Sequence, residues 1–261
     1  MRIGIVGYGV VGKAVTEGFR SLGFEVYVND ICSDRNFNSK RSLVDNCDLI
    51  FICVPTPNNR DGTMNILPLI EVIQVFLDIS NEAVVPPLII KSTVLPNTCK
   101  NLNKIYNPKL KFSSNPEFIT EKNATTDFLN ADRTIIASDY PETLELLRDV
   151  YATFKNVNIT DTTTAELAKY LSNIFLVNKV AFAVEMGKIA NIYNVNSEDL
   201  GRLVCSDRRI GLSHMNPKYG KIPKNSPCLP KDIKAFNSEL RNKRACSCLF
   251  TAVENVGIEE K

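Results

Sequence analysis

The first part of the chain alternates between short apolar runs and longer amphipathic stretches. Runs of the kind that form buried strands lie at 2–6, 25–28, 48–53, 88–92 and 134–137. The stretches between them carry apolar residues at helical spacing, most clearly up to Arg20, at 67–79 and at 142–154. Strands and helices that alternate in this way are typical of a parallel sheet with helices on both faces. We therefore predict an α/β fold for residues 1–161, a Rossmann-like doubly wound parallel sheet.

A different pattern begins at Thr162. A helix-compatible run reaches about Tyr193 without a proline, and its first glycine is Gly187. Its apolar residues fall on more than one face, which suggests burial between subunits as well as within one. After a polar, lysine-rich loop at 206–227, helical patterns resume at 230–242 and 246–256. We predict an all-helical domain over residues 162–261 that forms a homodimer through its long helix.

A glycine turn follows the first predicted strand directly. It reads Gly7-Tyr8-Gly9-Val10-Val11-Gly12, and Asp30 follows the second predicted strand. In this dinucleotide fingerprint the first glycine allows the tight turn, the second lets a pyrophosphate approach the backbone, and the third lets helix pack on strand. The acid roughly 20 residues further on accepts hydrogen bonds from ribose hydroxyls and repels a 2′-phosphate. The pattern predicts NAD as the cofactor, with Val10 and Val11 also in the binding loop.

Three loops of unusual sequence stand at predicted strand ends. They are Val54-Pro55-Thr56-Pro57, Ser92-Thr93-Val94-Leu95-Pro96 and Asn115-Pro116-Glu117-Phe118. Ligands of doubly wound sheets bind at the carboxyl ends of the strands. We expect these loops to border the same site as the glycine turn.

Composition and charge exclude several other classes of function. The 31 Lys and Arg nearly balance the 29 Asp and Glu and are interspersed with them, so there is no basic stripe for nucleic acid or anionic lipid. The first apolar run is too short for a signal or a membrane span, and we expect a cytoplasmic protein with free thiols. Cys246 and Cys248 lack the spacing of a zinc site, and His214, the only histidine, is expected in a loop. We predict no metal.

Six segments in order resemble the UDP-glucose/GDP-mannose dehydrogenase family over nearly the whole chain. The first is the glycine fingerprint with Asp30. The other five are Val-Pro-Thr-Pro at 54–57, Lys-Ser-Thr-Val at 91–94, Asn-Pro-Glu-Phe-Ile-Thr-Glu at 115–121, Glu166-Leu-Ala-Lys169-Tyr-Leu-Ser-Asn173 and Cys228-Leu-Pro-Lys-Asp232. The resemblance implies oxidation of the C6 alcohol of a nucleotide-sugar, with UDP-glucose expected first, to a carboxylate. Two NAD are consumed, and a thioester forms on a cysteine between the two hydride transfers.

By this resemblance the cysteine is Cys228. Pro230 is suited to an early helical position and would place Cys228 near a helix N-terminus, where the dipole favours thiolate. The alternative is a buried, inert thiol, which is the expectation for the other cysteines.

The resemblance also assigns the remaining roles. Lys169 and Asn173, four residues apart on one helix, would stabilise an alkoxide and a thiohemiacetal oxyanion and contact the substrate. Asp232 would accept a proton or orient a water together with Thr93, and Glu117 would assist thioester hydrolysis. The remaining assigned residues are Val54, Pro55, Thr56, Thr93 and Glu121 for the cofactor, and Glu117, Phe118 and Arg209 for the substrate. Arg209 would reach the substrate of a neighbouring subunit.

Two departures from the family pattern keep other functions open. Pro223-Lys224-Asn225-Ser226-Pro227 stands where the family carries a glycine-rich loop, and nothing after Val256 can encode the further α/β domain that completes the nucleotide site. One alternative is a related β-hydroxyacid dehydrogenase, which needs no thiol nucleophile. Another is a non-catalytic NAD-binding module.

Overall fold

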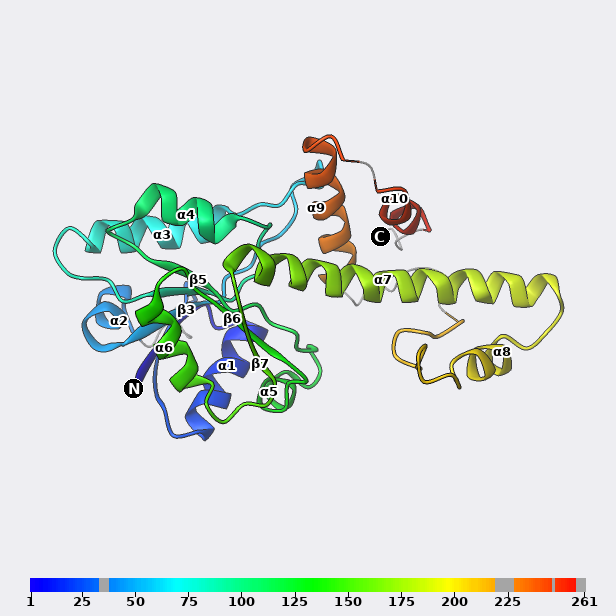
Figure 1. Ribbon diagram of the computed structural model, residues 1–261, viewed down its shortest axis with the longest axis horizontal. Coiled ribbons are helices and arrows are strands. Elements are labelled where there is room, and N and C mark those ends of the chain that lie inside the picture. The colour runs from blue at the N-terminus through cyan, green and yellow to red at the C-terminus, as the bar shows by residue number, and fades with distance from the viewer. Residues whose placement is uncertain (33–37, 219–227, 246, 257–261) are drawn as a thin grey trace. The chain divides into compact units, whose positions relative to one another are not determined.

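A computed structural model of the chain describes residues 1–32, 38–218, 228–245 and 247–256, except for the side chain of Cys228 (Figure 1). It divides into two compact units, of which the first comprises Met1–Pro57 with Asn65–Lys169 and the second Asn58–Met64 with Tyr170–Lys261. The sequence pattern predicts domains 1–161 and 162–261. The compact units instead change within the long helix, and the short segment 58–64 is part of the helical unit.

The first unit is built on a seven-stranded sheet with the strand order β2-β1-β3-β4-β5-β6-β7. The strands are β1 (Arg2–Val6), β2 (Glu25–Asn29), β3 (Leu49–Ile52), β4 (Leu88–Ile90), β5 (Phe112–Ser114), β6 (Thr134–Ala137) and β7 (Val157–Thr160). The five predicted strands are all present, and the doubly wound architecture is confirmed. The sequence pattern missed β5 and β7, because β5 is short and contains two serines and β7 is not buried.

One pair of neighbouring strands departs from the parallel arrangement. β5 and β6 pair antiparallel through Ser114 and Ala137, whereas every other neighbouring pair is parallel. A parallel neighbour requires a crossover that returns the chain to the opposite edge of the sheet, and an antiparallel neighbour does not. The chain therefore enters β6 from the edge of the sheet at which β5 ends, after the short α5.

Helices cover both faces of this sheet. Those of the first unit are α1 (Val10–Ser21), α2 (Lys40–Asn46), α3 (Leu67–Ile79), α4 (Thr98–Tyr106), α5 (Ala124–Leu129) and α6 (Pro141–Val150). Successive side chains of β3 point to opposite faces, as strand geometry requires. Ile50 and Ile52 are buried with residues of α2, α3 and α4, whereas Leu49 and Phe51 are buried with residues of α1, α5 and α6. The strands are therefore apolar on both faces, which is why they were visible in the sequence.

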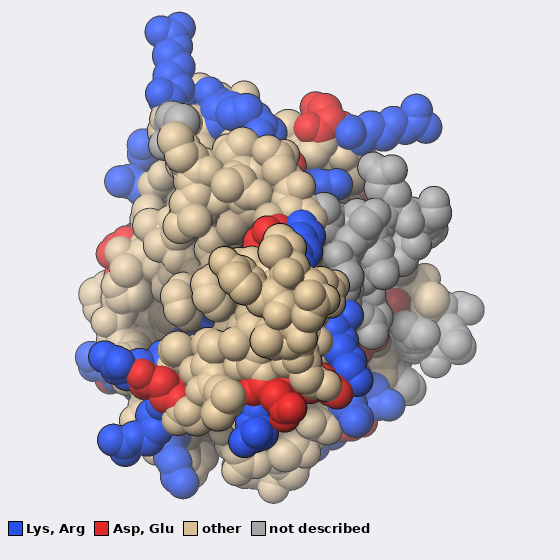
Figure 2. Space-filling model, turned by 90° about the vertical axis from the view of Figure 1, so that its right-hand side faces the viewer, with Lys and Arg blue, Asp and Glu red and all other residues tan. Residues whose placement is uncertain are grey.

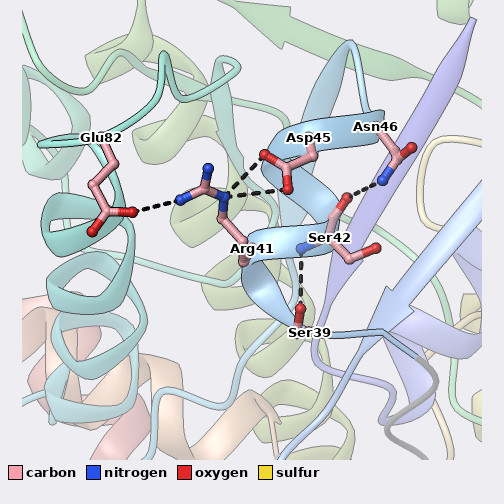
Figure 3. Close-up of polar contacts among 6 residues, drawn as sticks. All are labelled: Ser39, Arg41, Ser42, Asp45, Asn46 and Glu82. Atoms are coloured by element: carbon pink, nitrogen blue, oxygen red, sulfur yellow. Dashed lines mark hydrogen bonds and ion pairs between the residues drawn. The ribbon is translucent and has the colours of Figure 1, made fainter.

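Polar contacts at the surface hold α2 in place (Figure 3). Ser39 precedes the helix, and its side chain accepts the backbone N–H of Ser42, so it caps the N-terminus. Arg41 is ion-paired with Asp45 one turn later and, at 2.8 Å, with Glu82 beyond the end of α3. These side chains are exposed, so each pair stabilises the fold only slightly.

The second unit is helical. Its helices are α8 (Ser197–Val204), α9 (Cys228–Asn242) and α10 (Cys248–Asn255), together with most of α7 (Thr162–Ile192). Tyr170 of α7 stacks on Phe236 of α9 with ring centroids 5.4 Å apart, and Phe236 also meets Phe250 of α10. Further along α7, Met186 packs with Cys205 in a small buried cluster. The predicted long helix and its two following helices are confirmed, and α8 is an addition.

Among the described residues, α7 is long and apolar enough to cross a membrane by length and composition alone. Part of its most apolar stretch, 44%, is buried inside the protein. The core helix of a soluble protein passes the same test, so the helix is weak evidence for a membrane span.

Candidate functional site

The topological switch point of the sheet lies between β1 and β3. β2 pairs with one side of β1 and β3 with the other. Just beyond the strand ends, the N–H of Gly7 donates to the carbonyl of Asn29 (2.8 Å), and that of Cys53 to the carbonyl of Val6 (2.7 Å). Sheets of this kind hold ligands beside such a point, at the carboxyl ends of the strands. The glycine turn therefore occupies the position at which this architecture binds a dinucleotide.

The three glycines of the turn face different surroundings. Gly7 has φ +94°, and a Cβ on it would lie 2.7 Å from the carbonyl oxygen of Cys53. A Cβ on Gly12 would lie 1.8 Å from the carbonyl oxygen of Gly7, so only glycine lets α1 approach the turn. A Cβ on Gly9 would have no atom within 4 Å. Gly9 is thus not needed for packing within the protein, and the space beside it is open to a ligand.

The start of α1 and Asp30 complete this part of the site. α1 begins at Val10 with no acidic residue in its first turn, so the exposed N–H groups of its N-terminus favour an anion. The carboxylate of Asp30 accepts the N–H of Tyr8 at 2.5 Å and that of Cys32 at 2.9 Å, which fixes the acid beside the turn. Open space at Gly9, a helix N-terminus and a nearby carboxylate fit the pyrophosphate and the adenosine ribose of NAD.

The loops after β3 and β4 are joined by side-chain hydrogen bonds. The hydroxyl of Thr56 donates to the carbonyl of Thr93 at 2.7 Å, and that of Ser92 to the carbonyl of Val54 at 2.7 Å. Val54, Pro55, Thr56 and Thr93, all assigned to the cofactor, therefore belong to one connected edge of the first unit.

Glu117 forms a buried ion pair with Lys91. The lysine Nζ lies 2.8 Å from Oε2 of Glu117 and donates to Oδ1 of Asn115 at 2.7 Å. Tyr151 donates its hydroxyl to the same Asn115 oxygen at 2.6 Å. Burial alone would lower the pKa of Lys91, but the carboxylate of Glu117 outweighs this and raises the pKa. The lysine is therefore charged, and Glu117 lies against a fixed positive charge.

Phe118 lies between two cations of the first unit. The guanidinium carbon of Arg133 is 4.1 Å from the ring centroid, and Nζ of Lys169 is 5.2 Å from it. Cations within about 6 Å of an aromatic ring are attracted by its negative face. The structure thus brings together Phe118 and Lys169, both predicted to contact substrate. Glu121 is exposed in the turn before α5.

Glu166, in the first turns of α7, caps α4 from outside. Its carboxylate accepts the N–H groups of Thr98 and Cys99 at 3.1 and 2.8 Å, where Asn97 makes no side-chain cap. Burial raises the pKa of Glu166, although these hydrogen bonds partly oppose the rise. This contact fixes the part of α7 that carries Lys169 against the sheet of the first unit.

The helical unit contains a second polar pair. The amide nitrogen of Asn173, on α7, donates to Oδ2 of Asp232, on α9, at 2.6 Å, and both side chains are buried. Lys231 lies 2.7 Å from the other carboxylate oxygen. The amide of Asn58, in the segment 58–64, donates to the carbonyl of Lys231. Two of the predicted catalytic residues are therefore in direct contact.

The other predicted residues of this unit are described less fully. Cys228 is the first residue of α9, as expected from Pro230, but its side chain and the 223–227 loop lie outside the described residues. Arg209 is exposed and ion-paired with Asp207 at 2.6 Å. His214 lies in a loop, as predicted, with φ 63°. Within the described part of the chain no group of three His, Cys, Asp or Glu is placed to hold a metal ion.

Sequence reasoning missed three residues that support the predicted ones. Lys91, Glu166 and Lys231 contact Glu117, the start of α4 and Asp232, respectively. All three stand inside the quoted motifs, so their position in the sequence was a usable signal. The partners of these residues could not be predicted, because an ion pair between different strands or helices has no fixed spacing in the sequence.

Comparison with protein families gives two adjacent matches. The model described as "UDP-glucose/GDP-mannose dehydrogenase family, NAD binding domain" matches residues 33–155, and that of the central domain of the same family matches residues 163–257. The UDP-glucose 6-dehydrogenase of Rickettsia bellii is 35% identical over 218 residues, which are 80% of this chain and 48% of that protein. The chain spans about half the length of the curated relatives that it matches first.

Solved structures give the same picture of the fold. A UDP-glucose dehydrogenase from the hyperthermophilic archaeon Pyrobaculum islandicum matches 98% of this chain and 67% of its own, with a TM-score of 0.89 and 27% identity. The 3-hydroxyisobutyrate dehydrogenase of Mycobacterium tuberculosis matches 98% of this chain and 92% of its own, with a TM-score of 0.72 and 15% identity. At that identity the second likeness shows the fold alone.

Proposed function

We propose that this chain oxidises the C6 primary alcohol of a nucleotide-sugar to a carboxylate. The chain belongs to the UDP-glucose/GDP-mannose dehydrogenase family and has its NAD-binding and central domains. UDP-glucose is the first substrate to test. The observation that carries the proposal is the buried hydrogen bond between Asn173 and Asp232. Asp232 lies near the start of α9, the helix that begins at Cys228. Buried polar pairs stabilise a fold little and are more readily explained by chemistry.

The proposed roles follow from the chemistry of each group. NAD, when bound, accepts the hydride in each of two oxidations. Lys169 and Asn173 stabilise negative charge on the C6 oxygen, and Asp232 takes up the proton of the alcohol. The Cys228 thiolate adds to the aldehyde, and the second oxidation leaves a thioester on its sulfur. Glu117, with Thr93, orients the water that hydrolyses this thioester. Each sugar consumes two NAD and one water.

The decisive measurement is the yield of NADH. Purified protein is supplied with NAD and, one at a time, with UDP-, GDP- and N-acetylated nucleotide-sugars. We expect two NADH per sugar with the true substrate, and Cys228→Ser is expected to stop net turnover because no thioester can form. If no sugar yields NADH while NAD still binds, the chain is a cofactor-binding module and not this enzyme.

A related β-hydroxyacid dehydrogenase is the second candidate. The observation that favours it is the pair Lys169 and Asn173, four residues apart on α7, which a single oxidation could also use. A single two-electron oxidation would give one NADH per substrate, and Cys228→Ser would leave its rate unchanged. The same assay with β-hydroxyacids therefore separates the two candidates.

The proposal includes a homodimer formed through α7. Phe175, Phe182 and Ile189 recur at intervals of seven along this helix and are 65, 58 and 50% exposed. Apolar residues at this spacing form one stripe, as in helices that pair with one another. Figure 2, which looks onto the ends of α7 and α8, shows much uncharged surface with Lys, Arg, Asp and Glu mainly around it.

The dimer is tested with a charge placed in this stripe. Phe182→Arg is expected to halve the mass measured by light scattering, because burying an arginine against its own copy leaves the charge unpaired. Ile105→Arg, at an exposed apolar position on α4, is the matched control and is expected to leave the mass unchanged. A wild-type protein that is monomeric at micromolar concentration would contradict the proposed dimer.

A further inference from the structure

Lys91 is a deeply buried charged side chain of the first unit, and the proposed mechanism does not use it. It follows β4, and only 2% of its side chain is exposed. Its ammonium lies 5.4–6.0 Å from the ring centroids of Phe51, Phe128 and Tyr151, in addition to its contacts with Glu117 and Asn115. A cation enclosed in this way costs free energy to bury unless a specific partner compensates it.

Glu117 is the charged partner among the described groups that face Lys91. Cys53, after β3, and Tyr151, after α6, also face the lysine, but burial raises the pKa of both, to about 12 for Cys53. Asn115 is uncharged. Through the range in which an enzyme assay is run, the cluster therefore consists of one ammonium, one carboxylate and neutral groups.

Both members of the pair are buried, and the lysine is the more completely enclosed. The side chain of Glu117 is 11% exposed, against 2% for Lys91. One carboxylate oxygen of Glu117 accepts the N–H of Phe118 at 2.8 Å, and the other meets Lys91 at 2.8 Å. One oxygen is thus hydrogen-bonded and the other ion-paired, and the glutamate is the more exposed member of the pair. Any chemical effect of Lys91 has to pass through Glu117.

We propose that Lys91 is a positioning residue for the hydrolytic half of the reaction, holding the carboxylate of Glu117 oriented toward the water that attacks the thioester. This inference rests on the proposed function. In the step concerned, the water oxygen bonds to the thioester carbon, its proton passes to the Glu117 carboxylate, and the carbon–sulfur bond breaks to release the cysteine thiolate. The two hydride transfers precede this step and do not require Lys91.

The experiment separates hydrolysis from oxidation in the variant Lys91→Met, which keeps the length of the side chain and removes its charge. After rapid mixing with excess NAD and UDP-glucose, we expect a first burst of two NADH per subunit within about threefold of the wild-type rate. Steady turnover is expected to fall about 100-fold or more, the lower end of what a positioned base contributes. The thioester then accumulates and is detected as added mass on the intact protein.

A further measurement distinguishes positioning from a structural role. In a Glu117→Gln background, Lys91→Met is expected to change hydrolysis by less than about threefold, because the lysine acts only through that carboxylate. The double variant Lys91→Met with Glu117→Gln buries no unpaired charge, so it tests the role of Lys91 even if Lys91→Met alone does not fold.

Lys111→Met is the matched control, since Lys111 pairs with Glu142 at 2.6 Å on the surface; we expect wild-type bursts and turnover. A burst that falls together with turnover in Lys91→Met, or a further loss of hydrolysis in the double variant, overturns the role of Lys91 and leaves the proposed function intact. A wild-type protein that yields no NADH overturns both. A burst of two NADH followed by slow turnover and an acyl adduct supports both.

Discussion

Two glycines of the same turn separate folding from cofactor binding when each is replaced by alanine. Gly9→Ala adds a Cβ that meets no protein atom within 4 Å, at φ −76°, which alanine adopts freely. Gly12→Ala adds a Cβ 1.8 Å from the carbonyl oxygen of Gly7, so helix and turn must separate by at least about 1.2 Å to reach 3.0 Å. Gly9→Ala is therefore expected to weaken cofactor binding, and Gly12→Ala is expected to lower the stability of the fold.

The magnitudes follow from overpacking. Forcing an extra methyl group into a close-packed contact costs about 1–3 kcal/mol. For Gly12→Ala this cost falls on the free energy of unfolding of the protein itself. For Gly9→Ala it falls on the complex, where the methyl group occupies the space of the pyrophosphate, and it weakens NAD binding by about 5–150-fold. The unfolding free energy of Gly9→Ala should change by no more than about 1 kcal/mol, which is the difference between glycine and alanine as N-caps.

Urea unfolding and fluorescence titration with NADH measure the two effects on the same samples. Gly9→Ala is expected to keep the wild-type unfolding midpoint and lose affinity, whereas Gly12→Ala is expected to lower the midpoint. A Gly9→Ala protein that binds NADH as tightly as the wild type would refute the reasoning, because the open space at Gly9 would then not be where the pyrophosphate lies.

Two further predictions concern buried acids. Burial raises the pKa of Glu166 above its ordinary value of 4.5, so the stability this acid contributes is complete below pH 4.5 and is lost as pH rises through the raised pKa. Urea unfolding from pH 4 to 8 should therefore show the wild type losing stability relative to Glu166→Gln, and a constant difference would contradict this assignment. Asp232→Asn is expected to lower kcat about 10²–10⁴-fold and leave NADH affinity unchanged, because it removes a proton acceptor from the helical unit and nothing from the glycine turn. Loss of NADH affinity in that variant would show that Asp232 serves the cofactor instead.

Much of the fold could be predicted because its strands are apolar on both faces and its glycine turn has a fixed spacing. β1, β3 and β4 are almost wholly buried, and such runs are visible without knowledge of their partners. β7 could not be found this way, since its residues alternate and none is fully buried. α2 and α5 are only seven and six residues long, too short for a periodic pattern to identify.

The candidate site was predicted as a set of positions and not as a set of contacts. The motifs indicated Glu117 and Asp232, but the partner of Glu117 is at Lys91, on the neighbouring strand, and that of Asp232 is at Asn173, on another helix. Such pairs depend on how strands and helices align, and sequence spacing does not encode that alignment. The contact between Asn173 and Asp232 joins two residues that the resemblance had assigned separate roles.

β5, one of the two strands that the sequence pattern missed, lies among buried polar residues of the first unit. β5 reads Phe-Ser-Ser, and Ser113, Ser114, Asn115 and Glu117 follow one another into the core with almost no exposure. Burying four polar side chains within five residues lowers stability unless each is hydrogen-bonded or paired, and an apolar strand would serve the sheet better. Local rules of folding are broken most often where function requires it. The failure of the pattern at β5 is therefore independent support for chemistry at Glu117, since it needs neither the motif nor the family. It also makes Lys91 a test of that chemistry, because a lysine that acts through Glu117 slows hydrolysis when it is replaced by methionine beside an intact Glu117, and costs nothing further in hydrolysis when Glu117→Gln is already present.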